Sequence, residues 1–245
     1  MLAQRKKTRT KLLLILLSLL LTSGAICAHY FLDPWGFYWK ASAEETALRL
    51  QYVETAQKYL GCNEADATHR PIIDQYNSHE PLAMGYKVQY IDSWCSTFVS
   101  SIAIECDFTS IIPTECGCER HIELFKNIGC WQENENMIPL PGDLIFYDWE
   151  QKSPGNAIGW SDHVGIVVGT KWPFVKVIEG NKDDSVSYRV IPLCDFRIRG
   201  YAQPNFDKLI QKNAVSSLLT AFFLFIKVED LLQFPIFLFH FQTQR

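Results

Sequence analysis

Four side chains of this sequence have the types that a cysteine hydrolase needs: the thiol of Cys95, the imidazole of His163, and the polar groups of Glu179 and Asn181. A thiol becomes a strong nucleophile once it has lost its proton, and a neighbouring imidazole can accept that proton. A carboxylate or amide oxygen beside the imidazole fixes its tautomer and orientation. These residues therefore predict Cys95 as nucleophile and His163 as base, with Glu179 or Asn181 orienting the ring.

Cys95 lies where a helix is expected to begin. Asp92 or Ser93 can cap a helix that runs to about Cys106. Its apolar positions are Trp94, Phe98, Val99, Ile102 and Ala103. At a helix start the backbone N–H groups and the helix dipole favour a thiolate, typically by ~0.3–1 kcal/mol. The same N–H groups can later hold the oxyanion of a tetrahedral intermediate.

His163 and Glu179 belong to two strands joined by a turn at 169–173. If Lys171 is at the centre of that turn, His163 lies directly across from Glu179. A shift by two residues sets His163 across from Asn181. In either even register the three side chains share one face of the sheet, whereas an odd register or a bulge, which Pro173 can impose, would separate them.

Each candidate also has a structural interpretation. Cys95 can be a buried helix cysteine, His163 a strand-end histidine that bonds a carbonyl, and residues 179–181 only a turn. Asp162 can orient His163 instead, but neighbouring strand residues point to opposite faces, so Glu179 ranks above it. Gln89 is a candidate oxyanion donor, with a polar loop role as the alternative.

The pattern of the rest of the chain predicts an α+β domain in which N-terminal helices pack on an antiparallel sheet. A first helix is expected over 42–61, with Ser42 and Glu45 as a capping box, followed by a polar loop over 62–76. A third helix is expected over 115–128, between Thr114 as cap and Gly129 as stop. Strands are expected at 143–148, 163–169, 174–179, 186–191 and 197–203.

The composition of the chain disfavours two classes of ligand, nucleic acids and metal ions. The chain has 245 residues and a net charge of −4 without a basic stripe, which argues against nucleic acid as the main ligand. Its eight cysteines form no Cys-x-x-Cys pair. Cys116 and Cys118 lie close to His121, but their spacing is unusual for zinc, and Cys118 falls on the apolar helix side. We expect no metal and no cofactor, with the cysteines as small buried residues or as disulfides outside the cell.

Both ends of the chain differ from the middle. Five cations in residues 1–11 precede an uncharged stretch of 17 residues, 12–28. This pattern predicts a cytoplasmic basic segment followed by a signal-anchor or signal peptide, which places the rest outside the cell. A retained single-pass anchor is favoured over secretion by cleavage after Ala28. Residues 29–45 are expected to be a linker, and 207–245 an apolar tail without an assigned role.

Four segments resemble the motifs of the CHAP family of cysteine amidohydrolases and peptidases, in the papain-like and NlpC/P60-like group. They read WCSTFV at 94–99, PGDLIF at 141–146, DHVGIV at 162–167 and IEGN at 178–181. The resemblance covers residues 46–206. It implies that Cys95 is the nucleophile, that His163 is general base and acid, and that Glu179 and Asn181 orient the histidine.

The same resemblance implies a substrate. Family members hydrolyse amide bonds in bacterial peptidoglycan, either the N-acetylmuramoyl-L-alanine bond or a bond within the peptide. The sequence is therefore interpreted as a membrane-tethered or exported cell-wall hydrolase, with peptidoglycan and the membrane as its partners. The alternative is an inactive wall-binding or assembly module of a secretion or conjugation apparatus. A cytoplasmic peptidase for exported peptides is disfavoured by the cationic N-terminus.

Overall fold

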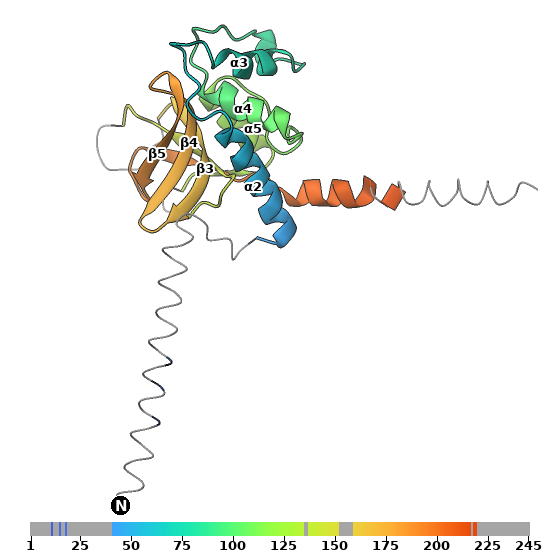
Figure 1. Cartoon of the computed structure of the whole chain (residues 1–245), viewed down its shortest axis with the longest axis vertical. Helices are drawn as coiled ribbons and strands as arrows, with labels where there is room; N and C mark the ends of the chain where they lie inside the picture. Colours follow the sequence, from blue (N-terminus) through green and yellow to red (C-terminus); the bar gives the residue numbers. More distant parts are fainter. Residues whose placement is uncertain are drawn as a thin grey trace, which may run out of the picture.

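The structure is a computed structural model that describes residues 41–134, 137–151, 159–216 and 218–219, together with Lys11, Ile15 and Ser18. Helices come first along the described chain and strands second (Figure 1). The helices are α2 (Ala43–Gln57), α3 (Arg70–Asn77), the 3-10 helix η1 (Ala83–Gly85), α4 (Cys95–Glu105) and α5 (Cys118–Asn127). The strands are β1 (Trp131–Gln132), β2 (Leu144–Tyr147), β3 (His163–Lys171), β4 (Phe174–Lys182), β5 (Ser185–Pro192) and β6 (Ile198–Ala202).

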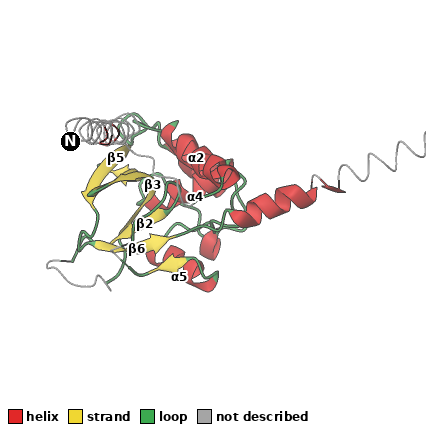
Figure 2. Ribbon diagram, turned by 90° about the horizontal axis from the view of Figure 1, so that it is seen from below, coloured by secondary structure: helices red, strands yellow, loops and turns green. Residues whose placement is uncertain are grey.

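The six strands form one open antiparallel sheet in the order β1-β6-β2-β3-β4-β5. Helix α4 packs on β3 and β4, and α2 packs on β3 and α4. Figure 2 shows these helices on one side of the sheet. The α+β class and the antiparallel sheet predicted from the sequence are therefore confirmed.

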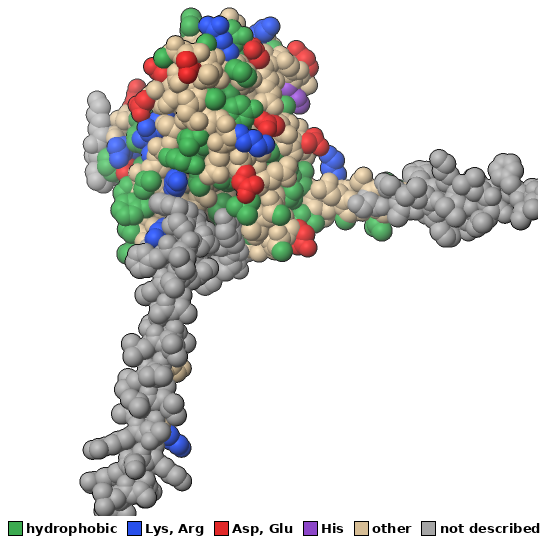
Figure 3. All heavy atoms as spheres, in the orientation of Figure 1, with side chains coloured by type: hydrophobic (Ala, Val, Ile, Leu, Met, Phe, Trp, Pro, Cys, Tyr) green, Lys and Arg blue, Asp and Glu red, His purple; other side chains and the backbone are tan. Residues whose placement is uncertain are grey.

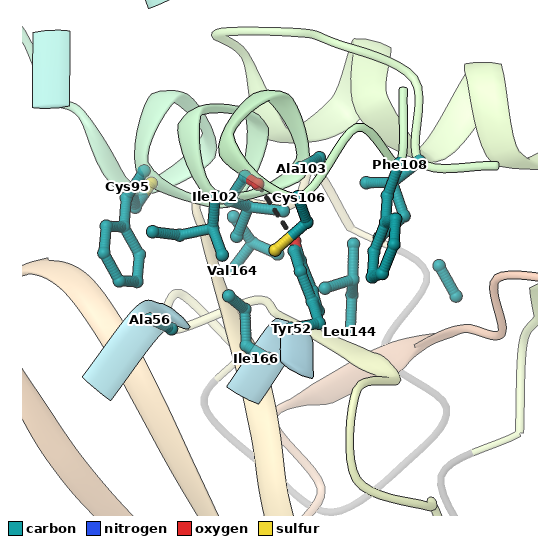
Figure 4. Close-up of a cluster of buried hydrophobic side chains, with 14 of the residues drawn as sticks. Tyr52, Ala56, Cys95, Ile102, Ala103, Cys106, Phe108, Leu144, Val164 and Ile166 are labelled. Carbon is teal, nitrogen blue, oxygen red and sulfur yellow. Dashed lines mark hydrogen bonds between the residues drawn. The ribbon is translucent and has the colours of Figure 1, made fainter. Parts of the chain in front are cut away.

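Alternation along the strands creates two apolar clusters, one on each face of the sheet. The cluster beneath the helices contains Leu144, Phe146, Val164, Ile166 and Ile178, together with residues of α2 and α4. The Tyr52 hydroxyl donates to the Val99 carbonyl at 2.9 Å and so ties α2 to α4, and Cys95 lies at the margin of this cluster (Figure 4).

The second cluster covers the opposite face and contains Ile145, Tyr147, Val167, Val177 and Tyr201. His163 alternates with Val164, and Glu179 with Ile178, so both polar residues belong to the row of Val167 and Val177. His163 is the first residue of β3, and Gly180, next to Glu179 in β4, lies against Trp94 and Phe98 at the start of α4.

Three local predictions need correction. The loop expected at 62–76 contains all of α3 except its last residue, because Pro71 occupies the first turn of that helix and Ile72, Ile73 and Tyr76 are buried. Helix α4 is capped by Trp94 rather than by Asp92 or Ser93. Helix α5 begins at Cys118, three residues later than expected, because Glu115 bonds the backbone N–H groups of 116 and 117 in the preceding turn.

An ion pair joins α2 to the turn before β2. Arg49 Nη1 donates to Asp143 Oδ1 at 2.7 Å and to the Pro141 carbonyl at 3.0 Å. Asp143 is fully buried and also accepts from the backbone N–H of Leu140 at 2.9 Å. Gly142, at φ +82°, lets the turn pass close to Arg49. This junction fixes where β2 enters the sheet.

The two ends are described only in part. A helix over 207–216 follows β6, and its Leu209 is buried in the cluster beneath the helices, so the predicted tail begins with residues that pack on the domain. At the other end, α2 starts within the expected linker. The basic segment apart from Lys11, most of the 12–28 segment, residues 29–40 of the linker and residues 220–245 lie outside the described residues. Within the described part of the chain, no helix has both the length and the hydropathy of a membrane span.

Candidate active site

The register of β3 and β4 decides which side chains meet His163. At the hairpin tip Lys171 pairs with Phe174, and at Val167/Gly169 a bulge shifts the register, so that Val167 pairs with Val177. Continuing this register sets His163 opposite Asn181 and diagonal to Glu179. Without the bulge, the tight turn at 172–173 would place Glu179 on the opposite face. A bulge was expected to separate these side chains, whereas the bulge observed here restores the even register.

His163 and Glu179 are hydrogen-bonded. The His163 Nε2 atom lies 3.1 Å from Glu179 Oε2, and the Glu179 side chain is fully buried. The imidazole stacks on Tyr147, with ring centroids 5.9 Å apart and an interplanar angle of 26°. Because Nε2 is taken by the carboxylate and one ring face by Tyr147, Nδ1 is the nitrogen left for a partner on the α4 side.

That partner is Cys95, the first residue of α4, which is buried and in electrostatic contact with the His163 ring. Hydrogen bonds from Cys118 and then from His163 hold the pKa of Cys95 well below its usual value, although burial opposes them. Burial alone would lower the pKa of His163, but its bonds to Cys95 and Glu179 outweigh burial and raise that pKa to about 10. Both shifts favour a thiolate at Cys95 beside an imidazolium at His163.

Arg189 on β5 completes the arrangement. Its Nε donates to both Glu179 oxygens, at 2.8 and 2.9 Å, and its guanidinium lies 4.5 Å from the centre of the Trp149 ring. Burial would raise the pKa of Glu179, but the bonds from His163 and Arg189 lower it. Charges therefore alternate along a row from Cys95 through His163 and Glu179 to Arg189, which is how a buried carboxylate can stay ionised.

The side chain of Asn181 does not join His163 and Glu179. It lies in a bulge of the β4–β5 pair with φ +55°, and its side chain leaves the row of Glu179. In the amide orientation that satisfies both neighbours, Asn181 donates to Glu64 Oε1 and accepts from the backbone N–H of Trp94, each at 3.3 Å. Glu64 also accepts from Trp94 Nε1 at 2.9 Å. Asn181 thus holds the residue before Cys95, and the structure gives it no bond to His163.

The other polar candidates have local partners. Asp162 accepts from the backbone N–H of Trp149 at 3.0 Å. Gln89 is exposed, and its side-chain amide donates to the Lys87 carbonyl at 2.7 Å. Neither side chain is hydrogen-bonded to Cys95 or His163 in the contacts of the described residues, so the structure assigns them to the loops around the site.

Three residues of this site were not found from the sequence: Tyr147, Arg189 and Cys118. Cys118 was interpreted as a core residue, and it is buried, but its sulfur lies 3.5 Å from the sulfur of Cys95. Tyr147 and Arg189 reach the site from neighbouring strands. Tyr147 pairs directly with His163 in the regular β2–β3 register, whereas Arg189 depends on the β4–β5 pairing, which can be counted only when its bulge is known.

A surface pocket of about 440 Å³ borders these helix starts. Its walls come from residues 84–93 and from Cys116 and Arg120. Ser93 lies two residues before Cys95, and Cys116 two residues before Cys118, so the pocket lies next to the first turns of α4 and α5. Acidic and basic side chains are interspersed on the face of the molecule seen in Figure 3.

The ion pair predicts how Cys95 reacts with iodoacetamide. Its alkylation should persist below the pH at which ordinary thiols, with a pKa near 8.5, stop reacting. Replacing Glu179 with Gln removes the charge that stabilises the imidazolium, so the pKa of Cys95 rises and the onset of alkylation moves to higher pH. We expect roughly a tenfold lower rate near neutral pH for each pKa unit of that change. Peptide mass mapping reports Cys95 separately from the other cysteines.

Asp162→Asn is the control for this experiment, because it removes a nearby carboxylate that is not bonded to the ring. Asp162→Asn should shift the pH at which Cys95 alkylation begins by less than Glu179→Gln does. Equal profiles for the native chain and Glu179→Gln would contradict the proposed coupling of the carboxylate to the thiol.

A scan against models of known protein families finds no match, and searches among curated proteins and solved structures find none. Among the described residues, no three His, Cys, Asp or Glu side chains are grouped so as to hold a metal ion.

Proposed function

We propose that this chain is a cysteine-dependent peptidoglycan hydrolase that cleaves an amide bond, either the N-acetylmuramoyl-L-alanine bond or a bond within the peptide. The observation that carries the proposal is that His163, which is hydrogen-bonded to Glu179, interacts electrostatically with the Cys95 thiol at the start of a helix. A nucleophile, its base and the group that orients the base are what covalent acyl transfer requires.

In the proposed reaction the Cys95 thiolate attacks the amide carbonyl, and the N–H groups at the start of α4 stabilise the oxyanion. The amide C–N bond breaks as His163 gives its proton to the leaving amine, which leaves a thioester on Cys95. His163 then takes a proton from water, and the hydroxide attacks the thioester. The acid product departs, and the thiolate–imidazolium pair is restored.

The substrate class is supported by two features of the sequence. The four motifs at 94–99, 141–146, 162–167 and 178–181 resemble those of CHAP hydrolases, which act on peptidoglycan. The basic N-terminus followed by the apolar 12–28 segment would place the domain on the side of the membrane that faces the wall. In this proposal the chain is a single-pass membrane protein, or a secreted one if the segment is cleaved.

The experiment is to incubate the full chain, in mild detergent, with purified peptidoglycan and to identify the released muropeptides by mass spectrometry. A new glycan-free peptide that starts with alanine indicates an amidase. A new terminus within the peptide or cross-bridge indicates an endopeptidase. Binding to peptidoglycan without any product, and without alkylation of Cys95, would contradict the proposal and favour the inactive wall-binding module.

A further inference from the structure

Two thiols meet where α4 and α5 begin. Cys95 and Cys118 are the first residues of these helices, both are buried, and their sulfur atoms are 3.5 Å apart. A disulfide bond is about 2.05 Å long, so closing it requires an approach of ~1.5 Å shared between the two side chains. The hydrolysis proposed above uses only one of these thiols.

The two thiols have opposite character. Cys95 is the thiolate of the pair with His163, whereas Cys118 keeps its proton, because its bond to Cys95 and then its burial raise its pKa well above the usual value. Oxidants react with thiolates, so oxidation begins at Cys95. Cys118 then stands in contact with the oxidised sulfur.

We propose that Cys118 is a resolving cysteine: once a peroxide has oxidised Cys95, Cys118 closes a Cys95–Cys118 disulfide that reversibly blocks the nucleophile and protects it from irreversible oxidation. The blocking role rests on the proposed function, in which Cys95 is the nucleophile. The disulfide itself depends only on the contact between the two sulfurs.

The proposed cycle has three steps: oxidation of Cys95, formation of the disulfide, and its reduction. The Cys95 thiolate attacks a peroxide oxygen, the O–O bond breaks, hydroxide leaves, and Cys95 becomes a sulfenic acid after losing two electrons to the peroxide. The Cys118 sulfur attacks this sulfenic sulfur, so that an S–S bond forms, the S–O bond breaks, and the hydroxyl group departs with the Cys118 proton as water. A low-molecular-weight dithiol returns both cysteines to thiols and is itself oxidised to a disulfide.

Cys116 provides the matched control. It lies two residues before Cys118 in the same turn and is half-buried, and its sulfur is 3.6 Å from Arg120 Nη2. A reaction that depended only on the number of thiols in this turn would treat Cys116 and Cys118 alike. A reaction that depends on contact with Cys95 requires Cys118.

The test uses the full chain in its reduced form, treated with hydrogen peroxide and then divided. One half is digested for peptide mass mapping, and the other is returned to dithiothreitol before the iodoacetamide reactivity of Cys95 is measured. In the native chain we expect a linked pair of peptides that contain Cys95 and Cys118, and nearly complete recovery of reactivity. In Cys118→Ser we expect sulfinic and sulfonic acid at Cys95 and loss of most of that recovery, whereas Cys116→Ser should resemble the native chain.

Recovery in Cys118→Ser as complete as in the native chain would overturn the inference, as would a link from Cys95 to another cysteine. Cys118→Ala gives the same readout if the serine variant does not fold. The experiment measures the iodoacetamide reactivity of the Cys95 thiol and not the release of muropeptides. The resolving role of Cys118 and the hydrolase activity can therefore be refuted independently. A reversible Cys95–Cys118 disulfide without muropeptide release would refute only the hydrolase, and muropeptide release without the disulfide would refute only the resolving role.

Discussion

Replacing Cys95 with alanine is expected to abolish the release of muropeptides, with a fall in rate on the order of 10⁴-fold or more. The reason is that the covalent route is lost, since no other thiol is in contact with His163 in the described part of the chain. Cys95→Ser should also lose most activity, because an alcohol gives up its proton far less readily than a thiol. The measurement is the initial rate of product release from purified peptidoglycan, with near-ultraviolet circular dichroism as a check on folding.

Cys106→Ala is the matched control for this prediction. Cys106 caps the other end of α4 and is also buried, but its partners are the Gln51 carbonyl, at 4.0 Å, and Thr55 on α2, not His163. It should keep the native rate. Native activity in Cys95→Ala would mean that another group performs the attack, and the proposed mechanism would have to be abandoned.

Arg49→Leu is expected to lower the free energy of unfolding by about 3–5 kcal/mol, the usual cost of breaking a buried ion pair from one side. It leaves the fully buried Asp143 carboxylate without its cation, although the Leu140 N–H bond remains. Urea denaturation of the full chain measures the change. Lys58→Leu is the control, because its pair with Glu105 is mostly exposed and such pairs contribute about 0–1 kcal/mol.

Measuring stability at lower pH distinguishes two causes for the lower free energy of unfolding of Arg49→Leu: the unpaired charge of Asp143 and the loss of side-chain packing. Burial raises the pKa of Asp143 already in the native chain, against the opposing effect of Arg49, and removal of Arg49 raises it further. A carboxyl group whose pKa is raised on folding favours the folded state when protonated, and this contribution disappears as the pH rises through that pKa. The difference in free energy of unfolding between the native chain and Arg49→Leu should therefore become smaller as the pH is lowered. A deficit independent of pH would indicate lost packing.

The sequence predicted those parts of the site that local patterns encode. Cys95 stands at a helix start because the apolar positions that follow it repeat with helical spacing, and His163 begins a strand because β-branched residues follow it. Helix α3 was missed because Pro71 was interpreted as a loop residue, although proline suits the first turn of a helix.

The remaining residues of the site depend on pairings that simple counting does not give. The β4–β5 turn pairs Lys182 with Ser185, yet Val177 pairs with Arg189 after a bulge, so counting from the turn puts Arg189 on the wrong face. The same bulge carries Asn181 away from His163. Cys118 reaches Cys95 through the packing of α5 against α4, which no local pattern reports.

The bulge in β3 bears on the order of events during folding. A hairpin closed at 172–173 and paired regularly would set Ile166 beside Glu179 and turn the carboxylate toward the helices. The bulged register instead turns Ile166 and Ile178 together toward the helices, where both belong to the cluster beneath α4. The final alignment of His163 with Glu179 is therefore expected to form together with the docking of α4, the same step that brings Cys95 to the imidazole.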